Sequence, residues 1–177
     1  MPPDSSDPTP TAAVVRTAPP LPLGLRLRLD PTPSNVGRLD GGWWPRSRDP
    51  DAELPELIAG LESAGGPITR VALNLDAWDR APRRVAVDGR RLRVGWFRTM
   101  DPNVIGLTRG AFQERLALLV VPPQAATVAA GIAMAMAADP THSAGPADIL
   151  AAAGIDADAQ NSALPPTTAT PLGAATG

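Results

Sequence analysis

The sequence predicts an α+β domain, in which a largely antiparallel sheet of about five or six strands has two main helices packed on it. Three patterns indicate this fold class. Apolar and basic residues alternate over residues 25–29, the dipeptide Asp88-Gly89 separates two alternating runs, and residues 116–138 carry no charge. Alternation is typical of a strand with one buried face, and Asp-Gly between two such runs is a strong hairpin signal.

The first strand is expected at residues 25–29, where three leucines alternate with two arginines and point inward. Pro31 and Pro33 end it, because proline has no N–H to donate to a ladder. The segment with Trp43 and Trp44 then forms a turn or a short strand. Successive side chains of an extended chain face opposite ways, so we expect one of these two tryptophans to be partly exposed or to lie under a loop.

A helix is expected to begin after Asp49, whose side chain can cap free amides, with Pro50 at the first helical position. Apolar residues at helical spacing then share one face: Leu54, Leu57, Ile58 and Leu61. Pro55 lacks the N–H that a helix interior uses, so we expect an irregular first turn or a restart there. Gly65-Gly66-Pro67 ends the helix.

Further strands are expected at residues 69–75, 83–87 and 90–97. A two-residue turn at Asp88-Gly89 sets the register of the last two and places Arg84 directly opposite Arg93. Arg91 lies on the same face. Like charges at paired positions repel unless acidic neighbours, solvent or a bound anion lie between them, so Arg84, Arg91 and Arg93 form a secondary basic face.

The uncharged stretch 116–138 is long enough to cross a bilayer, but Pro122-Pro123 interrupts it. We therefore expect a central strand at 116–121, preceded by a strand at 104–109 and followed by a helix at 125–138. This helix would bury a stripe that includes Val128, Ile132 and Met136. A short helix is expected at 147–153.

The folded domain is expected at residues 23–153. Residues 1–22 are rich in Pro, Ser, Thr and Ala, and residues 154–177 in Ala, Pro and Thr, so we expect two disordered tails that bury too little apolar surface to fold. The chain does not open with a basic segment, an apolar run and a cleavage site. We therefore expect a cytoplasmic protein that does not associate with membranes.

The 177 residues include no cysteine and a single histidine, His142, which excludes thiol chemistry and a multi-histidine metal site. No phosphate-binding glycine motif occurs either. From these absences together we expect no metal and no cofactor. The formal net charge is −2, but residues 21–123 hold fifteen Arg against eight Asp and four Glu, a local charge of +3. This excess is small for a nucleic-acid module, so nucleic acid is not the expected partner.

Tryptophan and arginine gather in two segments, around residues 43–48 and 96–98. Arginine binds anions and stacks on aromatic rings, so these segments suit a ligand site. They equally suit a structural clamp in which arginines cover the ring edges. The ligand-binding candidates are Trp43, Trp44, Arg46, Arg48, Trp96 and Arg98.

Several of these segments together resemble a known family. They are the stretch LDGGWWPRSRD at residues 39–49, the helix with Glu53-Leu54-Pro55, the pair Trp96-Phe97, and LLVVPP at residues 118–123. The combination is similar to a family of small actinobacterial proteins known only as a domain of unknown function, over roughly residues 25–138. The resemblance implies a single cytoplasmic domain with variable tails, and it implies no activity and no functional residue.

We therefore expect a non-catalytic binding or regulatory module with its site around Trp43 and Trp44 and a small anionic ligand. One alternative is a small hydrolase-like enzyme that uses Asp40 or Asp76 with an arginine, and a recessed carboxylate of shifted pKa would favour it. Another is a structural or self-assembly domain that binds a second copy of itself, which an exposed apolar patch would favour.

Overall fold

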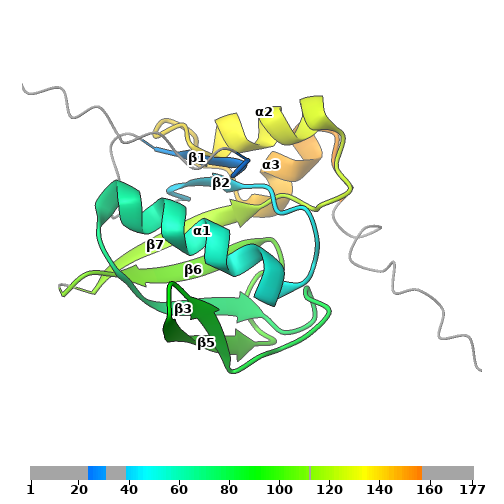
Figure 1. Cartoon of the computed structure of the whole chain (residues 1–177). Helices are drawn as coiled ribbons and strands as arrows, with labels where there is room; N and C mark the ends of the chain where they lie inside the picture. Colours follow the sequence, from blue (N-terminus) through cyan, green and yellow to red (C-terminus); the bar gives the residue numbers. More distant parts are fainter. Residues whose placement is uncertain (1–23, 31–38, 112, 157–177) are drawn as a thin grey trace, which may run out of the picture.

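The computed structural model describes residues 24–30, 39–111 and 113–156. In these parts of the chain a seven-stranded sheet has one helix on one face and two on the other (Figure 1). The α+β fold class is confirmed, with seven strands in place of five or six and three helices in place of two. Most of the two predicted tails lies outside the described residues, and apolar packing continues as far as Ile155, which is buried.

The described strands are β1 (Leu27–Leu29), β2 (Gly41–Trp43), β3 (Ile68–Asn74), β4 (Arg84–Val87), β5 (Arg90–Phe97), β6 (Val104–Arg109) and β7 (Glu114–Val120). The helices are α1 (Pro50–Gly65), α2 (Thr127–Ala137) and α3 (Pro146–Ala152). The strand order is β1-β2-β7-β6-β3-β5-β4. Among these strands β2 pairs with β7 and β3 with β5 in parallel, and the other four pairings are antiparallel.

Two hydrophobic clusters lie on opposite faces of the sheet, and consecutive residues of one strand divide between them. Leu118 packs in the cluster under α1, and Leu119 packs in the cluster under α2 and α3. Helix α1 contacts β3 and β4, whereas α2 contacts β1, β2 and β7. On the α2 side, the helix contacts with the sheet therefore lie mainly at its β1–β2–β7 end.

Helix α1 begins as the sequence predicts and passes Pro55 without a break. Asp49 is the N-cap and accepts a hydrogen bond from the Asp51 amide at 3.1 Å, and Pro50 is the first helical residue. The expected restart at Pro55 is wrong, because the helix runs unbroken to Gly65. The carbonyl left without its helical donor is that of Asp51, an exposed residue in the first turn, where water can take the place of the missing N–H.

Helix α2 packs on β2 through alanine, and this overturns the predicted stripe. Its buried residues are Ala130, Ala133 and Ala137, while Val128 and Ile132 are 76% and 45% exposed. Only small side chains fit on the buried side, because the helix backbone passes directly over a glycine of β2. No helix of the described chain combines the length and the hydropathy that a membrane crossing requires.

The β4–β5 hairpin has the predicted register. Asp88 and Gly89, both with positive φ, form the turn, and Arg84 pairs with Arg93 across the ladder. Val85 and Leu92 form the next pair, and both are buried on the α1 side. The basic face formed by Arg84, Arg91 and Arg93 therefore lies on the side of the sheet away from α1.

Candidate functional site

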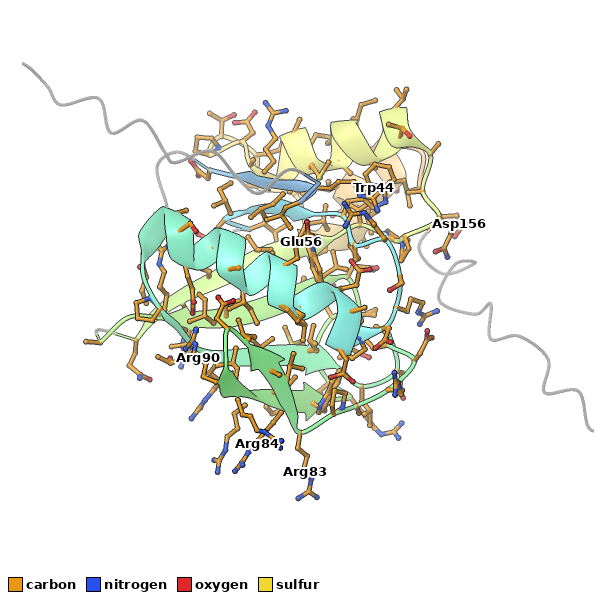
Figure 2. The ribbon with its side chains drawn as sticks, in the orientation of Figure 1. Trp44, Glu56, Arg83, Arg84, Arg90 and Asp156 are labelled. Atoms are coloured by element: carbon orange, nitrogen blue, oxygen red, sulfur yellow. The ribbon has the colours of Figure 1, made fainter. Side chains whose placement is uncertain are left out.

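The tryptophan pair lies in the two cores rather than on the surface. Trp43 is 1% exposed and stacks on Trp78, with ring centroids 5.7 Å apart. Trp44 is 8% exposed on the opposite face, where its Nε1 donates to the carbonyl of Pro122 at 3.2 Å (Figure 2). The two rings do face opposite ways, as expected. Neither ring is exposed, and Trp44 instead lies against the loop that contains Pro122.

Arg26 completes the environment of Trp44. Its guanidinium lies over the indole, 3.8 Å from the ring centroid, and donates to the Pro45 carbonyl at 3.0 Å. Burial lowers the pKa of Arg26, and the positive charge of Arg46 acts in the same direction. A neighbouring arginine thus covers the face of the Trp44 ring.

The remaining candidates of this group tie loops to elements. Arg46 forms an ion pair with Glu56 at 2.9 Å, and Arg48 donates to the Ala77 carbonyl at 2.8 Å. Trp96 Nε1 donates to the Pro82 carbonyl at 2.9 Å, and Arg98 forms an ion pair with Asp76 at 3.0 Å. These side chains have partners within the fold, and Asp76 and Arg98 are exposed on two different loops, after β3 and after β5. Their role in ligand binding stays a prediction.

The cavity beside the tryptophan pair is small. It is lined by residues that include Arg48, Trp78 and Pro122, and it encloses about 20 Å³. A volume of that size holds about one water molecule. A larger ligand would have to displace side chains that are already hydrogen-bonded.

The basic face extends well beyond the hairpin, as a row of residues at paired positions. Arg84 of β4 pairs with Arg93 of β5, and Arg93 directly precedes Val94, the parallel partner of Val71. Arg70 directly precedes Val71 and therefore lies beside Arg93. Arg70 pairs in turn with Thr108 of β6, and Thr108 pairs with Arg115 of β7. We call these five residues the arginine row: Arg84, Arg93, Arg70, Thr108 and Arg115.

The arginines of this row have no acidic partner among the described residues. The side chains of Arg70, Arg84, Arg93 and Arg115 are exposed and take part in no ion pair or hydrogen bond within that part of the chain. By contrast, Arg90 at the start of β5 lies on the α1 side of the sheet and forms an ion pair with Glu62. Figure 2 shows Arg84 projecting away from the ribbon at the β4–β5 end of the sheet. The charge of the row is therefore available to an anion from outside.

A second row of paired positions runs beside the first and contains only small residues. Ala72 of β3 pairs with Gly95 of β5 on one side and with Gly106 of β6 on the other, and Gly106 pairs with Ala117 of β7. We call these four residues the floor. With no side chain larger than a methyl group, the floor is lower than the rows that flank it.

An open cleft of about 880 Å³ lies over this floor. The arginine row borders it through Arg70, Thr108 and Arg115, and the loop before α3 borders it through residues 143–146. Phe97 is 51% exposed and also lines the cleft. A Cβ built on Gly95 would lie 2.9 Å from Phe97 Cε2, so the ring rests directly on that end of the floor.

Asp40 lies at the other end of the floor, beside Ala117. It is 9% exposed, and its Oδ2 accepts a hydrogen bond from the Ala117 amide at 2.7 Å. Burial raises the pKa of this carboxyl, while the Ala117 amide acts in the opposite direction. The cleft therefore has an exposed cationic side and one recessed carboxyl. This carboxyl can accept hydrogen bonds when ionised and exchange a proton with a ligand.

The described parts of the chain contain no group of three or more His, Asp or Glu side chains that could hold a metal ion. The groups that line the cleft include two guanidinium groups, the Thr108 and Ser143 hydroxyls, the Phe97 ring and the Asp40 carboxyl. Guanidinium groups bind phosphate and carboxylate with paired N–H donors, so the face is suited to an anion.

Sequence reasoning found three arginines of this face and missed the others. Arg84, Arg91 and Arg93 belong to one hairpin, whose register follows from its turn. Arg70 and Arg115 join them only through the order β5-β3-β6-β7. The alternation of Arg70 with buried Val71 was the available signal, but it does not say which strand lies next to it.

Comparison with curated proteins and with solved structures finds no match. A model of a family described as a family of unknown function, DUF5994, matches residues 26–137. This match covers more than half of the chain, and it contains the arginine row, the floor and Asp40. The chain therefore belongs to the DUF5994 family of unknown function.

Proposed function

We propose that the protein is a non-catalytic binding module for an anionic ligand, which it holds on the sheet face that α2 and α3 leave open. The arginine row carries this proposal. Arg84, Arg93 and Arg70 lie side by side on adjacent strands, and Arg115 follows one strand further on, beyond Thr108. None of these four arginines has an acidic partner among the described residues. Like charges at such positions repel each other, which costs stability that a bound anion would restore.

The same face supplies a place for the ligand as well as a charge. The cleft of about 880 Å³ is within the range of about 300–1,000 Å³ that is usual for small-molecule sites. The tryptophan pair, in contrast, adjoins about 20 Å³. This difference favours the secondary basic face over the surface around Trp43 and Trp44.

Isothermal titration with inorganic tripolyphosphate at low salt tests the proposal. The variant Arg70→Gln/Arg93→Gln removes two charges of the row, and Arg80→Gln/Arg98→Gln removes two exposed charges elsewhere that have acidic partners. We expect at least about tenfold weaker binding by the first variant, because two charge-assisted contacts are lost. The second variant should bind like wild type. Equal loss in both variants, or no binding by wild type, would contradict the proposal.

Asp40 favours a hydrolytic enzyme as the second candidate function. It is a recessed carboxyl with a raised pKa in the same cleft as Arg70 and Arg115, whereas Asp76 is exposed and paired with Arg98. Such a carboxyl can serve as a general acid or base. Recovery of the bound ligand unchanged after long incubation supports binding alone, and its cleavage by wild type but not by Asp40→Asn supports the enzyme.

A further inference from the structure

We propose that the anion is the sugar-phosphate backbone of a single-stranded nucleic acid, which lies across the strands with its phosphates on the arginine row and its bases over the floor. This inference rests on the proposed function and names its ligand class. The overall charge of the sequence argues against nucleic acid. The strand order, however, places the unpaired part of that charge on one face.

The length of the arginine row indicates a repeating anion. The row crosses five strands, and strands lie about 4.8 Å apart, so it spans about 19 Å. Only Arg70 and Arg115 of its arginines line the cleft, while Arg84 and Arg93 continue the row to the edge of the sheet. Arg83, also exposed and unpaired among the described residues, projects from the same edge (Figure 2). A single small anion would occupy one part of this row and leave the rest unused.

The floor and Phe97 favour bases beside that backbone. The Phe97 ring rests on Gly95 and is 51% exposed, so one side of the ring is available for stacking. The methyl groups and glycines of the floor leave space next to the ring for a flat group. An exposed aromatic beside a line of cations is the arrangement by which single strands are bound without a fixed sequence. An acidic peptide would use the arginines but gain little from the ring.

Asp40 sets the orientation of the strand. Its carboxyl lies at the end of the floor beside Ala117, and when ionised it repels a phosphate from the floor. Phosphates are therefore drawn to the row, and the uncharged bases take the floor. A duplex presents its phosphates outward and its bases stacked on one another, so it cannot place bases there.

Fluorescence anisotropy with labelled oligouridylates of increasing length tests this inference on the full chain. We expect the affinity to rise with length and level off within the range of about 4–16 nucleotides found for other single-strand-binding domains. Four phosphate contacts predict a slope of about −2.8 for log K against log salt, since each contributes about −0.7 on a single strand. Arg70→Gln should reduce the slope to about −2.1.

Phe97→Ala tests the stacking contact separately from the charge. We expect about 5- to 150-fold weaker binding of the oligouridylate, which is the effect usual for loss of one stacked base. Binding of tripolyphosphate should stay the same, and Phe97→Trp should restore oligouridylate binding. Because Phe97 is exposed, the fold of these variants is not at risk, and the urea midpoint of unfolding verifies it.

The failures of the two proposals are distinguishable. One result overturns the nucleic-acid inference but agrees with the anion-binding function. In that result tripolyphosphate binds through Arg70 and Arg93, while the affinity for oligouridylates depends neither on their length nor on Phe97. A duplex or polyglutamate that binds more tightly than the single strand also overturns the inference. If none of these anions binds wild type, both proposals fail.

Discussion

Replacing Gly42 by alanine tests the contact that fixes α2 on the sheet. A Cβ at this position would lie 2.8 Å from Met134 Cα and 3.0 Å from Met134 Cγ. Carbon atoms in contact normally lie about 3.5–4.0 Å apart, so the helix would have to move outward by roughly 0.7 Å. The atom in the way belongs to the backbone, and a change of side-chain rotamer cannot relieve the overlap.

The expected cost is a lower free energy of unfolding. Overpacking of this kind costs about 1–3 kcal/mol, of which up to about 1 kcal/mol is offset because alanine reduces the entropy of the unfolded chain. We expect a net loss of about 1–2 kcal/mol. Urea denaturation followed by circular dichroism measures it, and an unchanged m-value would show that the two-state comparison holds.

The chain offers a matched control of opposite sign. Gly131 lies within α2, and a Cβ built there meets no atom within 4 Å. Gly131→Ala should therefore stabilise the protein by about 0.5–1 kcal/mol, the usual gain inside a helix. A Gly42→Ala variant as stable as wild type would contradict the close contact between β2 and α2. A shift of stability in the same direction for both substitutions would contradict it as well.

Four other substitutions have expected outcomes. Burial raises the pKa of Asp40 in the folded state, so stability falls as pH rises through that pKa. Asp40→Asn should be more stable than wild type at neutral pH, and this difference should vanish below pH 3.8, the ordinary pKa of an aspartate side chain. Urea unfolding at several pH values measures the difference, and a difference that is the same at every pH contradicts the prediction. Trp44→Phe leaves the Pro122 carbonyl without its indole donor and should cost about 1–3 kcal/mol in the same assay, whereas an unchanged midpoint would mean that the bond is dispensable. Arg93→Gln should raise the melting temperature at low salt, because it removes repulsion within the arginine row. At high salt this repulsion is already screened, so the melting temperature should not change, and an equal rise at both salt concentrations would contradict repulsion as the cause. Val128→Lys should leave the melting temperature unchanged, since Val128 is 76% exposed. A lower mass of this variant than of wild type in light scattering would indicate that wild type self-assembles through α2.

The hairpin and α1 could be predicted because their determinants are local. Asp88-Gly89 fixes the turn and hence the pairing of Arg84 with Arg93, and Asp49-Pro50 fixes where the helix begins. Each of these features depends on residues that are neighbours in sequence. Their geometry follows from backbone preferences that act before any long-range contact forms.

The face of the candidate site could not be predicted, because it depends on which strands become neighbours. Arg70 and Arg115 are separated by 45 positions in sequence and meet through β6. The predicted buried stripe of α2 is wrong for a related reason. Its large residues, Val128 and Ile132, suggest a buried stripe, but Gly42 brings the helix so close that only alanines fit beneath it. Periodicity identifies a helix face and does not measure the space on the other side.

The floor has a consequence for how a ligand enters. Its depth comes from absent side chains on strands that are hydrogen-bonded on both sides, Ala72 and Gly106 in the middle of the sheet among them. A recess made in this way needs no lid to close and no segment to order. The shape that we propose as the ligand site is therefore present beforehand. Association with the proposed ligand should proceed without a slow conformational step and with little loss of chain entropy.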